Sequence, residues 1–528
     1  MSSAAAAVPP GERANPPGLA ELLCALSYAS GLAGTERMEH GTNTVFVGIQ
    51  LGRALGLETE DLEAIFYGGL LKDVGCGACG AVLAPFFADD ELAPRLDMKL
   101  IDIHSPHSML AWARSQLVLD PSLPARLARL AAFASHCGSV THEALAAHCE
   151  IAADFAARLG FGTHVQDAVH EQHERYDGRG PAFRRPGEAI PVPAQVLHLA
   201  LAAELARSLA GVEAAAAMVR QRAGTYFRPD VAEAYLDLAD GIWPPGDDPV
   251  PLADVLSCDP GTPADDLPGD RRLTVCEALA DFTDLKTIGR GLHSQAVAHL
   301  VGEAAAHLGF SPAEQDRLRR AGLVHDLGKI AVPYRMLEKA GDDTGGSGGP
   351  LGNSALAEPV RLHPYYAQRV LSQVRPLADL AADVGAHHER LDGSGYPLGI
   401  CGQRVPIGAR VLAAADAWAE RAVTGSPDLS GEEGLDAACV AALQSCALPG
   451  TRHQRQRPPV TGARPVLSSR EIEVLRLLAD GASNRDVSKA LFISRHTAEH
   501  HVEHILAKLG VTSRTAAVAY ALTYELLA

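Results

Sequence analysis

Apolar residues recur at intervals of three and four along most of the 528-residue chain, which is the spacing that places them on one face of an α-helix. Alternating runs of β-branched residues are few, and aromatic residues make up only 5% of the chain. We therefore predict an all-α protein in which helices bury their apolar faces against one another.

Three stretches interrupt this helical pattern. Ala and Pro fill residues 1–18, Pro and Asp are concentrated in residues 241–270, and Pro and Arg are frequent in residues 450–465. Because proline breaks the interior of a helix, we expect no helix to run through the second stretch. The division predicts a disordered tail, two large helical domains and a small one, at residues 1–18, 19–240, 271–449 and 466–528, with linkers at 241–270 and 450–465.

The two large segments are copies of each other. His40 stands 32 residues before Lys72, and His293 stands the same 32 residues before His325. Further on, QHERYDGRG lies 215 positions before HHERLDGSG. A constant offset over a long segment indicates an internal duplication.

The second copy concentrates histidines and carboxylates in apolar helical segments. A single histidine on a helix is more often an ordinary core or surface residue, but burying so many polar groups is costly unless something pairs them. Metal coordination provides that pairing, and nitrogen and oxygen ligands suit Fe, Mn, Zn or Ni. An adjacent His-Asp pair lets the aspartate bridge two ions. The candidate ligands are His293, His325, Asp326, His363, His387, His388 and Asp416.

The motifs HDLGK, which begins at His325, and HHERLDGSGYP, which begins at His387, resemble the HD-GYP subgroup of the HD phosphohydrolase superfamily, over residues 275–425. The resemblance implies that the seven candidate ligands hold two metal ions. It further implies that Asp326 and Lys329 are catalytic, with Lys329 contacting the scissile phosphate. The turn formed by Gly395, Tyr396 and Pro397 is implied to bind a cyclic dinucleotide, and the implied reaction is hydrolysis of cyclic di-GMP.

Two positions depart from that family pattern. Gly289 stands where some relatives have a glutamate for a third metal ion, so we expect two divalent transition-metal ions. After Asp416 the chain reads AWAERAVTGSP, where relatives have a second acidic residue and an Arg-Pro-Tyr segment. This altered wall leaves two alternatives open: a phosphohydrolase acting on another nucleotide, and a nucleotide sensor that does not hydrolyse its ligand.

The first copy lacks several of these residues. Lys72 replaces the motif histidine, Cys76 the lysine, Gln172 one of the paired histidines and Leu201 the final aspartate. A lysine ammonium opposes cation binding, so we expect an inactive copy that serves as a dimerisation or ligand-sensing scaffold, with the metal ions held by the second copy only. Cys76 and Cys79 form a lone C-x-x-C pair, for which a metal or redox role is the less favoured alternative.

The last sixty residues predict four short helices with a helix-turn-helix arrangement, in which residues 494–509 form the longer, polar-faced helix. The segments LSSREIEVLRLL, GASN, ISRHT and KLG resemble the LuxR-type DNA-binding domain. The resemblance implies a dimer that places helix 494–509 in the major groove of double-stranded DNA. A small bundle for protein contacts is the alternative. The expected phosphate donors are Arg495, His496, Lys508 and Arg514, and the expected base-reading residues are Thr497, Glu499 and His500.

The net charge of −18 excludes a protein that coats nucleic acid with its whole surface, although it allows a small DNA-binding module on an acidic body. Ten scattered cysteines favour reduced thiols over a disulfide scaffold. The start of the chain lacks the basic region of a signal peptide, and no apolar run is long enough for a membrane span. We therefore expect a cytoplasmic bacterial regulator that binds DNA and a cyclic dinucleotide, has no membrane partner and forms a homodimer.

Overall fold

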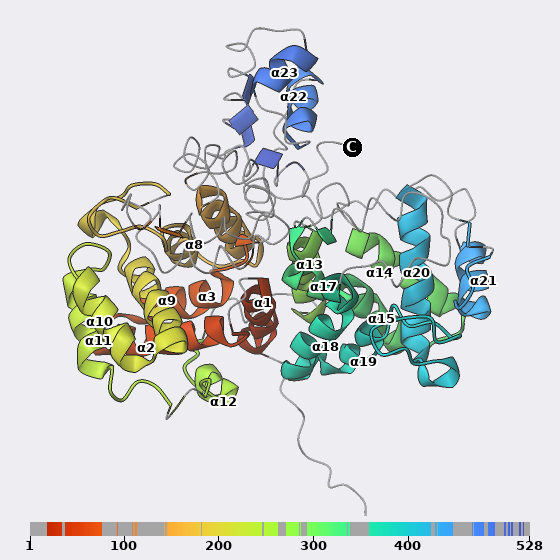
Figure 1. Cartoon of the computed structure of the whole chain (residues 1–528), viewed down its shortest axis with the longest axis horizontal. Coiled ribbons are helices and arrows are strands. Elements are labelled where there is room, and N and C mark those ends of the chain that lie inside the picture. The colour runs from red at the N-terminus through yellow and green to blue at the C-terminus, as the bar shows by residue number, and fades with distance from the viewer. Residues whose placement is uncertain are drawn as a thin grey trace, which may run out of the picture.

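The structure is a computed structural model whose longest described ranges are 18–33, 37–76, 145–180, 182–244, 248–261, 271–284, 293–334, 358–423, 431–446, 469–479 and 484–491, with shorter pieces between and after them. Within these residues the backbone is helical or irregular, and the one β contact is an isolated bridge between Ala223 and Phe227. The expected all-α fold is confirmed (Figure 1).

The first copy is a helical bundle. Its helices are α1 (Leu19–Ala33), α2 (His40–Ala54), α3 (Thr59–Leu71), α8 (Thr163–His170), the 3-10 turn η2 (Gly187–Ala189), α9 (Val192–Ala210), α10 (Val212–Arg222) and α11 (Pro229–Leu238). Helix α2 packs against α3 and α9. Proline near the first position of α9 and α11 fits their starts, where its missing N–H has no helical partner to lose.

The second copy repeats this bundle. It consists of α13 (Arg271–Asp284), α14 (His293–His307), α15 (Pro312–Val324), η4 (Leu327–Ala331), α17 (Glu358–Arg361), α18 (His363–Gln373), η5 (Arg375–Leu380), α19 (Ala381–Gly385), η6 (Gly402–Arg404), α20 (Ile407–Val423) and α21 (Ala437–Cys446). Helix α15 begins with a capping box, in which Ser311 and Glu314 satisfy each other's backbone N–H groups.

The duplication is visible in the helix bounds. Helices α2 and α3 start and end 253 positions before α14 and α15, whereas α9 and η2 start 215 positions before α20 and η6. The packing repeats as well, because α2 lies on α9 as α14 lies on α20. The duplicated sequence therefore encodes the same helical framework twice.

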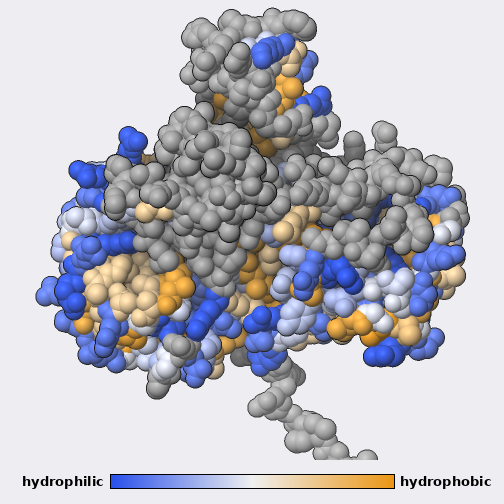
Figure 2. All heavy atoms as spheres, viewed as in Figure 1, coloured by the Kyte–Doolittle hydropathy of each residue, from blue (hydrophilic) through white to orange (hydrophobic). Residues whose placement is uncertain are grey.

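The two copies lie side by side (Figure 1) and share one continuous apolar core. Helix α1 of the first copy packs against α13, η4 and α18 of the second. At the edge of this contact Arg375 lies 3.3 Å from Glu21, and Arg158 forms an ion pair with Asp281. Polar side chains cover much of the described outer surface in the view of Figure 2, with apolar side chains in smaller patches between them. The first copy thus contacts elements that carry predicted site residues.

No described helix runs through the segment 241–270, but one short helix lies within it. Helix α12 (Leu252–Leu256) lies within it and packs against α2, directly after Pro251, a position where proline favours a helix start. The backbone N–H of Val250 donates to the Asn43 side chain at 3.0 Å, and the hydroxyl of Tyr67 donates to Asp259 at 2.9 Å. Apolar residues between the prolines therefore attach this part of the segment to the first copy.

The C-terminal part has its own small core. Helices α22 (Ser469–Ala479) and α23 (Asn484–Ala490) pack together. Val487, Val502, Ile505 and Leu509 are buried in one apolar cluster, and Leu491 is partly buried against it. Among the described helices of the chain, none combines the length and the apolar composition needed to cross a membrane.

Candidate metal centre

Three histidines of the second copy are oriented by the backbone in the same way. The ring nitrogen Nδ1 of His325 lies 2.8 Å from the carbonyl oxygen of Gly322, three residues earlier. His363 and His387 make the same contact with Val360 and Val384, each at 2.6 Å. A carbonyl can only accept, so each Nδ1 donates, and Nε2 of each ring is left facing the centre as the potential ligand atom.

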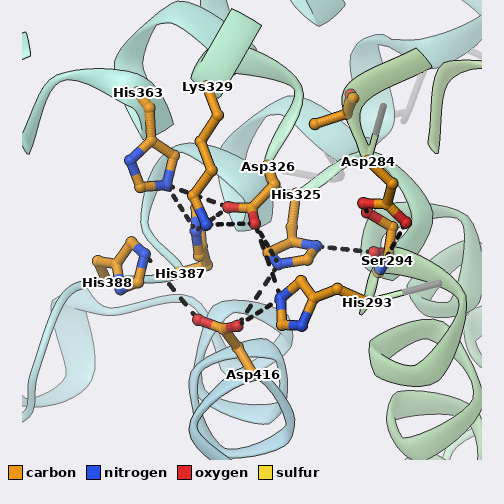
Figure 3. Close-up of polar contacts among 12 residues, drawn as sticks. Asp284, His293, Ser294, His325, Asp326, Lys329, His363, His387, His388 and Asp416 are labelled. Carbon is orange, nitrogen blue, oxygen red and sulfur yellow. Dashed lines mark hydrogen bonds and ion pairs between the residues drawn. The ribbon is translucent and has the colours of Figure 1, made fainter. Parts of the chain in front are cut away.

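The predicted ligands form two groups, and the histidines of the two groups lie on different sides of Asp326 (Figure 3). In each group the potential ligand atoms lie within 4.8 Å of one another. The groups consist of Asp326, His363, His387 and His388, and of His293, His325 and Asp416. The structure therefore brings all seven candidate ligands together.

The two carboxylate oxygens of Asp326 face different groups. Oδ1 lies 3.3 Å from Nε2 of His363 and 3.8 Å from Nε2 of His387. Oδ2 lies 3.4 Å from Nε2 of His325 and 3.7 Å from Nε2 of His293. This arrangement has the form that a carboxylate needs in order to bridge two ions.

Asp416 closes the opposite side of the centre. Its Oδ1 lies 3.0 Å from Nε2 of His293 and 3.6 Å from Nε2 of His325, and its Oδ2 lies 3.9 Å from Nε2 of His388. Each carboxylate therefore touches histidines of both groups.

The donor set fits divalent cations. Nε2 of His325 and Oδ1 of Asp326 are buried without a hydrogen-bond partner, which is costly unless another group satisfies them. Burial, together with the neighbouring His325 and His363, lowers the pKa of His387 to about 3. Burial and His387 likewise lower the pKa of His388 well below its usual value. Both rings are thus neutral, as metal ligands must be.

The two carboxylates are ionised. Burial alone would raise the pKa of Asp326, but His325 and Lys329 hold it well below its usual range. Burial also opposes ionisation of Asp416, but the neighbouring His293 and His325 hold its pKa well below its usual value. These two buried carboxylates provide negative charge that a divalent cation bound between them would balance.

Lys329 reaches the centre from η4, one turn beyond Asp326. Its Nζ lies 2.5 Å from Oδ2 of Asp326. Burial disfavours the ammonium, but Asp326 and Asp416 raise the pKa of Lys329 above its usual value. The lysine therefore stays charged at the edge of the predicted metal site.

The predicted substrate turn borders the same site. The ring of Tyr396 stacks on His388 with 4.7 Å between centroids, and burial raises the pKa of its hydroxyl. A Cβ on Gly395 would lie 2.4 Å from the backbone nitrogen of Arg390, so the turn requires glycine there. Pro397 follows Tyr396 directly and is half-buried.

Our sequence analysis missed Glu389, which anchors this turn. Its side chain is 2% exposed, and its Oε1 accepts a hydrogen bond from the backbone N–H of Leu398 at 2.7 Å. In the first copy, 215 positions earlier, Glu174 accepts from the N–H of Phe183 at 2.6 Å. The sequence contains a signal for this role, because the same glutamate recurs in the HER segments of both copies.

Asp284 is a second residue that the sequence did not reveal. Its carboxylate accepts hydrogen bonds from the hydroxyl and the backbone N–H of Ser294, at 2.8 and 3.2 Å (Figure 3). These bonds satisfy a free N–H group in the first turn of α14 and fix the start of the helix that carries His293.

In the first copy, internal ion pairs occupy part of the corresponding centre. Lys72 pairs with Asp73, and His40 pairs with Glu204, one helical turn beyond Leu201. The side chain of Gln172 donates to the backbone oxygen of Lys72 at 2.9 Å. Burial opposes ionisation of Glu204, but His40 holds its pKa below the usual value, so this carboxylate is charged.

The expected DNA-contacting residues are mostly outside the described residues. These are Arg495, His496, Thr497, Glu499, His500 and Arg514. Lys508 is described, and its side chain makes an ion pair within the domain. Its Nζ lies 2.7 Å from Oε2 of the buried Glu471. An ion pair across the small core therefore holds this lysine.

Two parts of the chain match known protein families. Residues 277–437 match the HD domain family, and residues 465–521 match the luxR family of bacterial regulatory proteins. The chain is 28% identical over 416 residues to 3'3'-cGAMP-specific phosphodiesterase 3 of Vibrio cholerae, covering 75% of this chain and 85% of that protein.

Two further relatives extend the comparison. A cyclic di-GMP phosphodiesterase of Thermotoga maritima is 32% identical over 148 residues, which are 28% of this chain and 37% of that protein. A crystal structure of a cyclic GMP-AMP-specific phosphodiesterase of V. cholerae has the same fold, with a TM-score of 0.52, 22% identity, and coverage of 81% of this chain and 97% of that one. The chain therefore joins an HD domain at residues 277–437 to a luxR-family regulatory domain at residues 465–521.

Proposed function

We propose that this protein is a DNA-binding transcriptional regulator whose second copy is a metal-dependent phosphodiesterase acting on a cyclic dinucleotide. The observation that carries the proposal is the placement of Asp326, whose two oxygens face two separate groups of histidines. Two divalent ions bound there would activate a water and neutralise charge on the phosphate. HD phosphohydrolases depend on metal ions, and the donor set here suits Fe, Mn, Zn or Ni.

The protein's own residues would act on the substrate from the edge of this centre. Lys329 presents a fixed positive charge that can stabilise negative charge developing on a non-bridging phosphate oxygen. The turn containing Gly395, Tyr396 and Pro397 would hold the dinucleotide, with the Tyr396 ring fixed against His388. Glu389 would act as a positioning residue that keeps this turn in place.

The class of substrate follows from the relatives, which are named for 3'3'-cGAMP and cyclic di-GMP. In this chain the wall after Asp416 is built by α20, and Glu420, one turn further on, raises the pKa of both Lys329 and Tyr396. We propose that Lys329 and the metal ions would contact the phosphate of such a dinucleotide, because they supply the positive charge beside this acidic wall.

The test of this activity is hydrolysis of a panel of cyclic dinucleotides by the full chain loaded with Mn or Fe. Linear dinucleotide or mononucleotide products support the phosphodiesterase. Tight binding of one panel member without any product would instead favour the sensor alternative, for which the ion pair between Lys329 and Asp326 is the supporting observation.

For the C-terminal domain we propose binding of double-stranded DNA as a homodimer, through helix 494–509. Arg495, His496 and Arg514 would contact phosphates, and Thr497, Glu499 and His500 would face base edges. The full chain should bind duplex DNA, and Arg495→Ala should weaken binding to all sequences alike, lowering the salt slope by about one.

The matched control for that experiment is Arg369→Ala, which removes an exposed arginine on α18. Glu499→Gln should raise affinity for random duplexes, because it removes a carboxylate near phosphates. If the full chain fails to bind any duplex at low salt, the domain is a protein-contact bundle instead.

A further inference from the structure

We propose that the first copy holds one zinc ion between Asp73, Cys76 and His148. A carboxylate oxygen, the sulfur and a ring nitrogen of these residues lie within 4.8 Å of one another, and all three residues are buried. Zinc binds cysteine, histidine and aspartate together, so the three donors suit this ion. The site is separate from the proposed catalytic centre and does not depend on it.

The position of the cluster within the duplicated fold supports a metal site. Asp73 and His148 stand at the repeat positions of Asp326 and His363, which belong to one of the two ligand groups of the second copy. Asp73 follows α3, and His148 lies in the helical segment 145–158. The first copy therefore keeps the framework of one half of the centre.

A glycine in each copy brings the two parts of that framework together. A Cβ on Gly75 would lie 2.2 Å from the backbone oxygen of His148, and a Cβ on Gly328 would lie 1.9 Å from the backbone oxygen of His363. Only glycine allows the turn after Asp73 or Asp326 to approach the histidine so closely. The same close approach in both copies places a carboxylate and an imidazole at matching positions.

Cys76 adds a sulfur donor to the carboxylate of Asp73 and the imidazole of His148. It occupies the repeat position of Lys329, so a positive charge in the second copy is replaced by a sulfur donor in the first. The sulfur lies 3.7 Å from Oδ1 of Asp73. A thiolate and a carboxylate together balance the two charges of Zn²⁺, whereas the lysine of the second copy cannot be a ligand while charged.

Lys72 explains why we propose one ion and not two. Its ammonium stands at the repeat position of His325 and pairs with Oδ2 of Asp73, on the side away from the sulfur contact at Oδ1. The neighbouring positions are filled by the pair of His40 and Glu204. These two ion pairs replace the second ion. This proposal departs from our expectation that the metal ions are held by the second copy only.

Cobalt substitution tests this site directly, because a cobalt–thiolate bond gives a sulfur-to-metal charge-transfer absorption that imidazole and carboxylate ligands do not. The seven proposed ligands of the second copy include no cysteine. The full chain carrying Asp326→Ala, which disables the second copy, is stripped of metal and titrated with Co²⁺ alone. We expect one Co²⁺ per chain with the charge-transfer band.

The variants decide the assignment. Adding Cys76→Ser should abolish the band, and adding His148→Ala should weaken Co²⁺ binding at least tenfold while circular dichroism verifies the helical fold. Cys439→Ser, which changes a buried free thiol of the second copy, should leave the band intact. A band that persists in Cys76→Ser, or the lack of any band in a folded parent chain, overturns the proposal. Neither result bears on hydrolysis by the second copy.

Discussion

The carboxylate of Glu389 holds the backbone N–H of Leu398 at 2.7 Å and so closes the turn that carries Tyr396. Losing a buried hydrogen bond of this kind costs about 1–3 kcal/mol. We expect Glu389→Ala to raise the KM for the cyclic dinucleotide about tenfold or more, without loss of metal ions, because the turn would no longer be fixed beside His388. Steady-state kinetics with metal analysis measures both effects.

Glu174→Ala is the matched control for this change, since Glu174 makes the corresponding bond to Phe183 in the first copy. It should leave KM unchanged. Equal kinetic effects of the two variants would show that the glutamates act only through general stability, and Glu389→Gln, which keeps an acceptor oxygen, should recover most of the affinity.

Lys329→Ala should separate charge stabilisation from metal retention. The seven proposed ligands stay in place, so the metal content should not fall, but cleavage should slow by roughly a hundredfold, as expected for the loss of one charge stabiliser. The comparison variant is Lys329→Arg, which keeps the charge. Wild-type turnover in Lys329→Ala would remove the lysine from the mechanism.

The stability of the first copy should depend on His198. Burial lowers its pKa from 6.5 to about 4, and its ring donates from Nδ1 to the backbone oxygen of Glu174 at 2.8 Å. Between pH 6.5 and 4 the unfolded chain binds a proton at His198, whereas the folded chain does not. Stability is therefore lost as the pH falls through this window, by up to about 3 kcal/mol.

Thermal unfolding across this pH range measures that loss. His198→Asn keeps a donor near the position of Nδ1 but has no titratable ring, so the variant should lose less stability than the wild type between pH 6.5 and 4. Parallel curves for the two proteins would assign the acid sensitivity to other groups.

The sequence predicted well that the histidines and carboxylates of the second copy would cluster, because several of them stand in contiguous motifs whose spacing is duplicated. His325 and Asp326 are adjacent, and the repeat offset aligns both copies without structural information. The all-α fold followed from the helical periodicity. The packing of α12 on α2 could not be predicted, because the apolar residues among the prolines of residues 241–261 do not indicate which helix they would contact.

The interactions that the sequence did not reveal depend on geometry between distant segments. Leu201 replaces the final aspartate, but Glu204 lies one turn further along the same helix and supplies a carboxylate to His40. The sequence alone predicts that Glu389 is a solvent-exposed charge in a turn, whereas the structure buries it and gives it a hydrogen bond from Leu398. Cys76 reads as half of a C-x-x-C pair, whereas the fold sets it beside Asp73 and His148.

The central claim is that Asp326 bridges the catalytic metal ions of the second copy. Its most direct test is metal analysis of the purified full chain together with cyclic dinucleotide hydrolysis, for the wild type, Asp326→Ala and the exposed control Asp379→Ala. The account predicts that Asp326→Ala loses two transition-metal ions per chain relative to the wild type and all hydrolysis, whereas Asp379→Ala loses neither. Full metal content or normal hydrolysis in a folded Asp326→Ala protein would contradict it.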